Sequence, residues 1–227
     1  MKNYSYTISY ERQADAWNWY YGCNSIGHGV NWSERVDASV AHMLQTLDYE
    51  EATRYLAAYL DQLFMNDADT FSHGGAFIEK RFKDDFQNAC IKLEEITGKE
   101  LYRHDFTVHL TTFPRAPYNY ENGEFWLPFE WTNPIANFMH ETLHFQTIHY
   151  WRENSESLAS QLDEDDFATL KEALTVVLDG SFVPPMERAD QGYEIHKNLR
   201  DLLYARWSKG LSFGELVEYG AGLCRNN

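Results

Sequence analysis

Hydrophobic residues recur at helical spacing along several segments of the chain. Residues 49–66 carry a single apolar stripe, which predicts an amphipathic helix. Residues 75–96 show the same period and are followed by Gly98, where a glycine commonly ends a helix. The same pattern predicts helices over residues 133–152, 167–178 and 187–207 and a short helix from Phe213.

Three segments have the pattern of strands. Residues 4–10 alternate between apolar and polar positions, and residues 105–113 are rich in β-branched and aromatic side chains. The third strand, residues 124–129, follows an Asn-Gly turn signal. Because Pro128 has no amide hydrogen to donate, we expect this strand at a sheet edge. The pattern predicts an α+β fold, mostly helical, with a small mixed sheet whose edge strand precedes a long helix.

The length of 227 residues suits one compact domain. The predicted elements run in the order helices, sheet, helices. We therefore expect an N-terminal sub-domain over residues 1–132 and a helical C-terminal sub-domain over residues 133–227, with a cleft between them. An aromatic segment, residues 17–22, has no clear period, and we interpret it as core or cleft wall.

The acidic character of the chain limits its partners. The formal net charge is -16, which opposes binding to nucleic acid phosphates and to anionic lipid. The first residues contain no apolar stretch like a signal peptide, and no segment resembles a membrane span. The three cysteines are scattered and form no C-x-x-C pair. We expect a cytoplasmic protein with reduced cysteines and no nucleic acid or membrane partner.

Candidate chemistry lies in five consecutive residues, His140-Glu141-Thr142-Leu143-His144. In the helix predicted over residues 133–152, positions i and i+4 lie on the same face. The imidazoles of His140 and His144 can therefore bind one cation together. Glu141 lies beside them without being a ligand, and it can act on a water molecule that the cation activates.

A catalytic zinc usually takes a third protein ligand, for which the sequence offers three candidates. His149 points about 140° away from His144 if the helix continues, so we reject it. The acidic residues Asp163, Asp165 and Asp166 precede a helix, where capping and the helix dipole already explain them.

Glu172 is the preferred third ligand. It lies on a helix that is apolar on nearly every side, opposite a leucine and valine stripe. A carboxylate in such a position needs a partner, because an unpaired buried charge is costly. Asp179, two turns later, is a candidate acceptor for the N–H group of a ligand histidine.

His140-Glu141-x-x-His144 followed by Glu172 on a later helix resembles the gluzincin group of zinc metallopeptidases, which has the thermolysin-like arrangement. The resemblance covers about residues 106–179 and implies a zincin-like fold, one zinc ion per chain and a peptide or protein substrate. It also implies that the strand at residues 124–129 binds an extended peptide. Lys171 and Val176 replace an asparagine and an aspartate of the thermolysin pattern, which indicates a separate small family.

The leading hypothesis is a zinc-dependent peptidase with ligands His140, His144 and Glu172 and with Glu141 as the general base. Tyr193, His196 and Arg200 share a face of a later predicted helix, so one of them is a candidate oxyanion donor. The alternatives are a zincin-fold module that holds zinc without turnover and a metal-free interaction protein.

Overall fold

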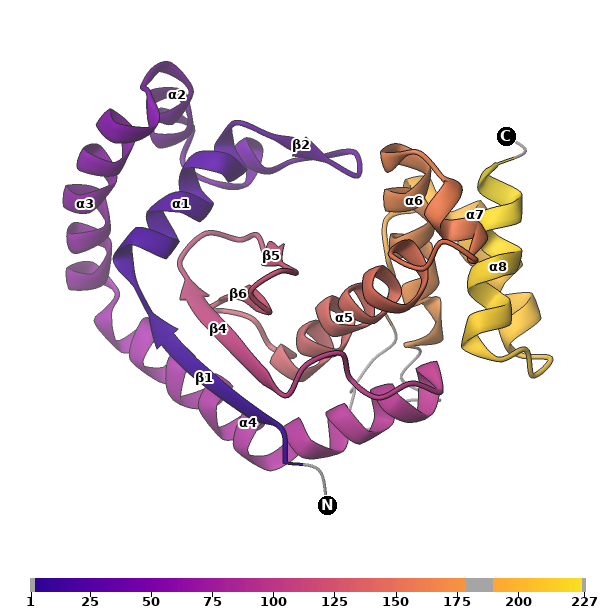
Figure 1. Cartoon of the computed structure of the whole chain (residues 1–227). Coiled ribbons are helices and arrows are strands. Elements are labelled where there is room, and N and C mark those ends of the chain that lie inside the picture. Colours follow the sequence, from indigo (N-terminus) through magenta and orange to yellow (C-terminus); the bar gives the residue numbers. More distant parts are fainter. Residues whose placement is uncertain (1–2, 179–189, 226–227) are drawn as a thin grey trace. The chain divides into compact units, whose positions relative to one another are not determined.

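The computed structural model describes residues 3–178 and 190–225 (Figure 1). The fold is α+β and 64% helical with a small mixed sheet, which confirms the predicted class. The chain forms two compact units. Unit 1 comprises Met1–Tyr4, Asp85–His104 and Ile135–Asn227, and unit 2 comprises Ser5–Asp84 and Asp105–Pro134. The division into sub-domains at residue 132 stays a prediction.

The sheet belongs to unit 2 and has the strand order β1-β4-β6-β5. Strands β1 (Ser5–Tyr10), β4 (Asp105–Thr111) and β6 (Glu124–Pro128) are parallel to one another. The short strand β5 (Tyr118–Asn119) pairs antiparallel to β6. All three predicted strand segments are therefore confirmed, with small shifts of their ends.

The prediction that residues 124–129 form the sheet edge is wrong for the first half of that strand. Strand β5 covers this half, because Asn119 pairs with Glu124 and Tyr118 pairs with Phe125. Pro128 is the last residue of β6 and pairs with Thr111 of β4. A proline removes a donor only at its own position, so the earlier residues of the strand keep theirs.

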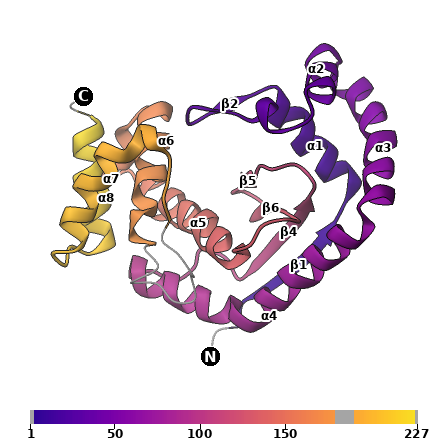
Figure 2. The same cartoon turned by 180° about the vertical axis from the view of Figure 1, so that it is seen from behind.

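Helices of unit 2 cover the sheet. The part of α4 (Ala68–Thr97) that belongs to unit 2 runs beside β1 (Figure 2). Phe82 in this part of α4 contacts Tyr6 of β1 and Phe125 of β6 with ring centroids 5.2 and 6.5 Å away. A second cluster of buried residues lies between α1 (Arg12–Cys23), α2 (Ala38–Thr46) and α3 (Tyr49–Asn66), and it includes Trp19, Leu44 and Leu56. Two short strands, β2 (Ile26–Gly27) and β3 (Val30–Asn31), and a turn of 3-10 helix, Trp32–Arg35, connect α1 to α2.

Helix α1 contains the segment that the sequence left unassigned. Its buried face includes Asp15 and Asn18, which are polar and therefore interrupt the apolar stripe. Asp15 accepts hydrogen bonds from Thr111 Oγ1 (2.6 Å), from Thr112 N (3.1 Å) and from Thr112 Oγ1 (2.9 Å). Trp19 Nε1 donates to the Thr112 hydroxyl at 2.8 Å. These bonds tie α1 to the end of β4.

We expect Asp15→Ala to lower the free energy of unfolding by about 3 kcal/mol, because it leaves donors of the buried Thr111 and the half-buried Thr112 without an acceptor. Asp15→Asn keeps one acceptor oxygen and should cost less. Urea denaturation monitored by circular dichroism measures both effects. Equal stability of wild type and Asp15→Ala would contradict this role.

Unit 1 contains the C-terminal helices. Helix α5 (Pro134–Thr147), whose Pro134 is the last residue of unit 2, continues into a π-type turn, Ile148–Arg152, and so matches the predicted segment. A 3-10 turn, Leu158–Gln161, then leads to α6 (Glu164–Leu174), which ends in another such turn, Thr175–Val177. Helices α7 (Lys197–Trp207) and α8 (Phe213–Cys224) follow. A Cβ at Gly220 of α8 would lie 2.5 Å from Leu170 Cδ1 of α6, so this glycine permits close packing of the two helices.

The helix predicted over residues 187–207 begins later than expected. Residues 187–189 lie outside the described residues, and residues 190–193 are not helical. The Asp190 carboxylate accepts a hydrogen bond from Gly192 N at 2.9 Å, and Gly192 has a φ of +61°. This local turn competes with helix formation until the 3-10 turn Glu194–His196.

Two further observations on the described residues concern the cysteines and the possibility of a membrane span. Cys23, Cys90 and Cys224 are buried and are not in disulfides. None of the helices described here has the length and apolar character needed to cross a membrane.

Candidate metal centre

Helix α5 presents His140 and His144 one turn apart, with ring centroids separated by 4.4 Å. His144 is 1% exposed and Glu141 is 5% exposed, whereas the side chain of His140 is 19% exposed. The predicted H-E-x-x-H arrangement on one helix is therefore present, with one imidazole at the rim of the cluster and one in its interior.

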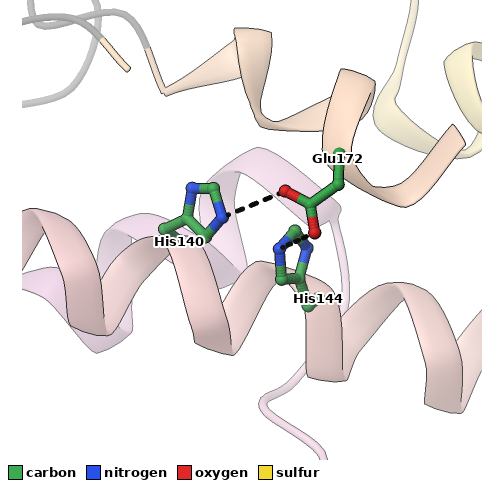
Figure 3. A group of neighbouring side chains, drawn as sticks. All are labelled: His140, His144 and Glu172. Atoms are coloured by element: carbon green, nitrogen blue, oxygen red, sulfur yellow. Dashed lines mark ion pairs between the residues drawn. The ribbon is translucent and has the colours of Figure 1, made fainter. Parts of the chain in front are cut away.

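Glu172 approaches both imidazoles from α6 (Figure 3). Its Oε2 lies 3.5 Å from His140 Nε2, and its Oε1 lies 3.2 Å from His144 Nε2. Ligand atoms of the three side chains all lie within 4.8 Å of one another. The side chains predicted as ligands thus form one group that could hold a metal ion.

The donor set fits zinc. Bonds of about 2.0–2.1 Å in tetrahedral geometry place two ligand atoms roughly 3.3 Å apart. The separations of 3.5 and 3.2 Å between Glu172 and the histidines start from its two different oxygens. One ligand atom from each of the three residues lies within 4.8 Å of the others, so the side chains would move slightly closer together around zinc. Two imidazoles and one carboxylate also match a common catalytic zinc site, which keeps a fourth position for water.

The other two candidates for the third ligand lie in different surroundings. His149 is exposed, and its Nδ1 lies 3.4 Å from Glu153 Oε2. Asp163 caps α6 by accepting a hydrogen bond from Asp166 N at 2.8 Å. Their roles are those of a surface histidine and of a helix cap, as the sequence indicated.

Asp190 is a residue of the cluster that sequence reasoning missed. Its Oδ2 lies 2.6 Å from His140 Nδ1, the ring nitrogen opposite the one that faces Glu172. A carboxylate in this position fixes the tautomer and orientation of a ligand histidine. The sequence suggested Asp179 for this role, and Asp179 lies outside the described residues. No local signal identifies Asp190, since it is separated from His140 by 50 residues.

Lys171 is a second residue whose role the sequence did not reveal. It is 6% exposed, and its Nζ donates to Glu172 Oε1 at 2.7 Å. The third candidate ligand therefore has a buried ammonium group as a neighbour. Buried lysines usually occur with an anionic partner, and here the partner is the carboxylate next to it in the chain.

Arg200 supports the cluster from α7. Its Nη1 donates to Thr175 Oγ1 at 2.5 Å and to the Glu172 carbonyl at 3.3 Å, and its Nη2 lies 3.4 Å from Asp190 Oδ1. The guanidinium group thus connects α6 to the Asp190 turn. Of the predicted trio, Arg200 is on α7 and His196 ends the 3-10 turn, but Tyr193 precedes both, so the three do not share one helix.

Tyr193 nevertheless interacts electrostatically with two glutamates of the site, Glu172 and Glu141. Burial, together with the charges of Glu172 and Glu141, raises the pKa of its phenol to about 12. The hydroxyl therefore keeps its proton at neutral pH and can donate a hydrogen bond.

Opposite pKa shifts distinguish the two histidines. Burial lowers the pKa of His140, but Asp190 and Glu172 outweigh it and hold the pKa well above 6.5. Burial and the Lys171 ammonium lower the pKa of His144 to about 3. Burial raises the pKa of Glu172, but the Lys171 ammonium and hydrogen bonds from the two histidines outweigh it, so the carboxyl is ionised. The metal-free cluster therefore holds one imidazolium, at His140.

Glu141 has a pKa suited to proton transfer. Burial raises its pKa to about 7, His140 opposes this shift and Glu172 adds to it. A carboxyl group with a pKa near the operating pH is an efficient general acid and base.

These shifts predict a pH-dependent zinc affinity. Zinc binds neutral imidazole, so His140 must release a proton, whereas His144 is already neutral at pH 7. The apparent affinity should therefore rise about tenfold per pH unit from roughly pH 6 until the pH exceeds the pKa of His140. In the metal-free protein, the stabilisation from the His140 imidazolium is complete below about pH 6.5 and is lost as the pH rises through that pKa.

Competition titrations with a chelator across this pH range measure the slope. Asp190→Asn removes the charge that raises the pKa of His140, so its slope should flatten at a lower pH than that of the wild type. An identical profile for this variant would contradict the assignment of the proton to His140.

No family model, no curated protein and no solved structure matches the chain.

Proposed function

We propose that the protein is a zinc-dependent hydrolase that cleaves peptide bonds. The observation that carries this proposal is the convergence of His140, His144 and Glu172 beside a buried Glu141. These ligands come from two helices, and two imidazoles with one carboxylate are a donor set that zinc commonly takes. A purely structural zinc site would have no use for a buried glutamate with a pKa of about 7 next to it.

Each residue has a distinct role in the proposed reaction. His140, His144 and Glu172 would hold the zinc, and Asp190 would orient His140. Zinc, when bound, acidifies a water molecule and polarises the substrate carbonyl. Glu141 accepts the proton of the attacking water and delivers it to the leaving amine. Its pKa of about 7 suits both transfers.

Tyr193 is our candidate for the oxyanion donor. Its phenol keeps its proton, because burial and the charges of Glu172 and Glu141 raise its pKa to about 12, and a protonated phenol can donate a hydrogen bond to an oxyanion. Arg200 is occupied by Thr175, Asp190 and the Glu172 carbonyl, so we assign it to the support of the cluster.

One observation favours an alternative without turnover. The ammonium group of Lys171 already neutralises Glu172 in the buried cluster. Such an ion pair can hold α6 in place with or without zinc. The alternatives are therefore a zinc-binding module of zincin fold and a metal-free protein in which the cluster is structural.

Zinc content and peptide cleavage separate these functions. We expect purified protein to contain about one zinc ion per chain by elemental analysis and to cleave members of a peptide library. Activity should disappear with a chelator and return with zinc. Zinc without cleavage would support the binding module, and the absence of zinc after reconstitution would overturn the proposal.

A further inference from the structure

A pocket of about 720 Å³ lies within unit 2. Residues of α1, of the β5–β6 hairpin and of neighbouring segments form its wall. The wall includes Trp17, Tyr118, Trp126, Glu11 and Glu124. The volume is in the range of small-ligand sites. All of its described lining residues belong to unit 2, whereas the candidate metal ligands belong to unit 1.

Aromatic rings in fixed positions form one part of the wall. Trp17 and Trp126 stack with ring centroids 4.9 Å apart, and the imidazole of His109 lies 4.7 Å from the Trp126 ring. Trp126 Nε1 donates to Ala14 O at 3.1 Å, which holds the indole in place. Trp126 is 6% exposed, with Trp17 and His109 against its ring, so the indole with surface left for a ligand is that of the half-buried Trp17. The face of an indole ring attracts organic cations, and most strongly where water is partly excluded.

Acidic groups form the other part of the wall. Glu11, Glu121 and Glu124 line the pocket, and none of its described lining residues is a lysine or an arginine. Arg12, next to Glu11 in sequence, pairs instead with Asp61. The pocket therefore combines negative charge with aromatic faces, and the chain as a whole carries a net charge of -16.

His109 is a further sign of a ligand. It lines the pocket and is 7% exposed, and within the described chain its Nδ1 has no hydrogen-bond partner. Its Nε2 lies 3.7 Å from Glu124 Oε1, beyond the usual length of a hydrogen bond. A buried imidazole with unused hydrogen-bonding capacity is uncommon in a wall that serves only packing.

We propose that this pocket binds the guanidinium group of an arginine side chain. A guanidinium is planar, so it stacks on indole rings, and its N–H groups match a carboxylate in a bidentate geometry. An ammonium group has the charge but lacks the flat face, and a metal ion would gain nothing from the indoles. The ligand is therefore an arginine-containing peptide or a free arginine derivative. This site is independent of the proposed hydrolase.

Titration of the full chain with Nα-acetyl-arginine amide tests the proposal. Calorimetry and tryptophan fluorescence measure the binding. The matched ligand is Nα-acetyl-citrulline amide, which has the same shape without the charge. We expect a dissociation constant on the order of 1 mM for the arginine compound and at least about tenfold weaker binding of the citrulline compound. Equal binding of both compounds, or binding of neither, would overturn the proposal.

Two variants locate the site. Glu124→Gln and Trp17→Ala should each weaken arginine binding by about tenfold, whereas Glu130→Gln, a change at an exposed glutamate outside the lining, should not. Trp17→Phe keeps an aromatic ring and should keep most of the affinity if Trp17→Ala fails to fold. Unchanged affinity in Glu124→Gln would overturn the assignment.

The titration also separates this proposal from the hydrolase. Chelator and the Glu141→Gln substitution should both leave arginine binding unchanged. Loss of arginine binding on zinc removal would contradict a binding site that is formed by residues of unit 2 alone.

Discussion

Glu141→Gln is expected to retain zinc and to lose peptide hydrolysis by roughly 1,000-fold in kcat/KM, within the range for general acid–base catalysis. The amide keeps the size of the side chain but cannot accept a proton. Zinc should remain, because Glu141 is not among the three candidate ligands. Elemental analysis and steady-state kinetics on a peptide selected from the library measure the two properties.

A matched substitution controls for the loss of a negative charge near α5. Glu153 is exposed and contacts His149 rather than the metal centre, so Glu153→Gln should leave both zinc content and kcat/KM unchanged. Hydrolysis that survives in Glu141→Gln would remove Glu141 from the mechanism. Zinc loss in the same variant would instead indicate that Glu141 supports the ligands.

Glu172→Ala is expected to weaken zinc binding by roughly 1,000-fold, because one of three protein ligands is lost. The substitution also leaves Lys171 buried without its carboxylate partner, which adds a destabilising positive charge beside the histidines. Competition with a chromophoric chelator gives the zinc affinity, and thermal denaturation reports whether the fold persists. Glu172→Gln, which keeps the shape of the side chain, serves where the alanine variant fails to fold.

Lys171→Met is the matched control for this experiment. It removes the ammonium group without removing a ligand, so zinc should stay bound, and its affinity should rise because a neighbouring positive charge is gone. Zinc affinity that is unchanged in Glu172→Ala would exclude Glu172 as a ligand. The residues of the acidic loop that were weighed against it, beginning with Asp163, would then be tested by alanine substitution.

Helix α3 shows what the local sequence pattern can predict. Its predicted bounds, Tyr49–Asn66, agree with the structure, because its buried residues recur at helical spacing and Asp48 forms a capping box with Glu51. Helix α1 was missed for the opposite reason. Its buried Asp15 and Asn18 form hydrogen bonds with Thr111, more than 90 positions away, and these polar residues interrupt the apolar stripe, so no helical period is visible in the sequence.

The same distinction applies to the metal centre. His140, Glu141 and His144 could be recognised in sequence, because a helix places positions i and i+4 together without help from the rest of the chain. Glu172 could be proposed, because a carboxylate on an apolar helix needs a partner. The contact of Asp190 with His140 and the burial of Lys171 against Glu172 could not be inferred.

The sequence by itself determined the helix-borne pair of histidines, the glutamate between them and the α+β class, since each depends on spacing within a single element. Only the tertiary structure decided which carboxylates contact the two imidazoles and which strand pairs with the outer side of β6. Contacts of this kind depend on how elements distant in sequence pack together, and the period of one element carries no information about its partner.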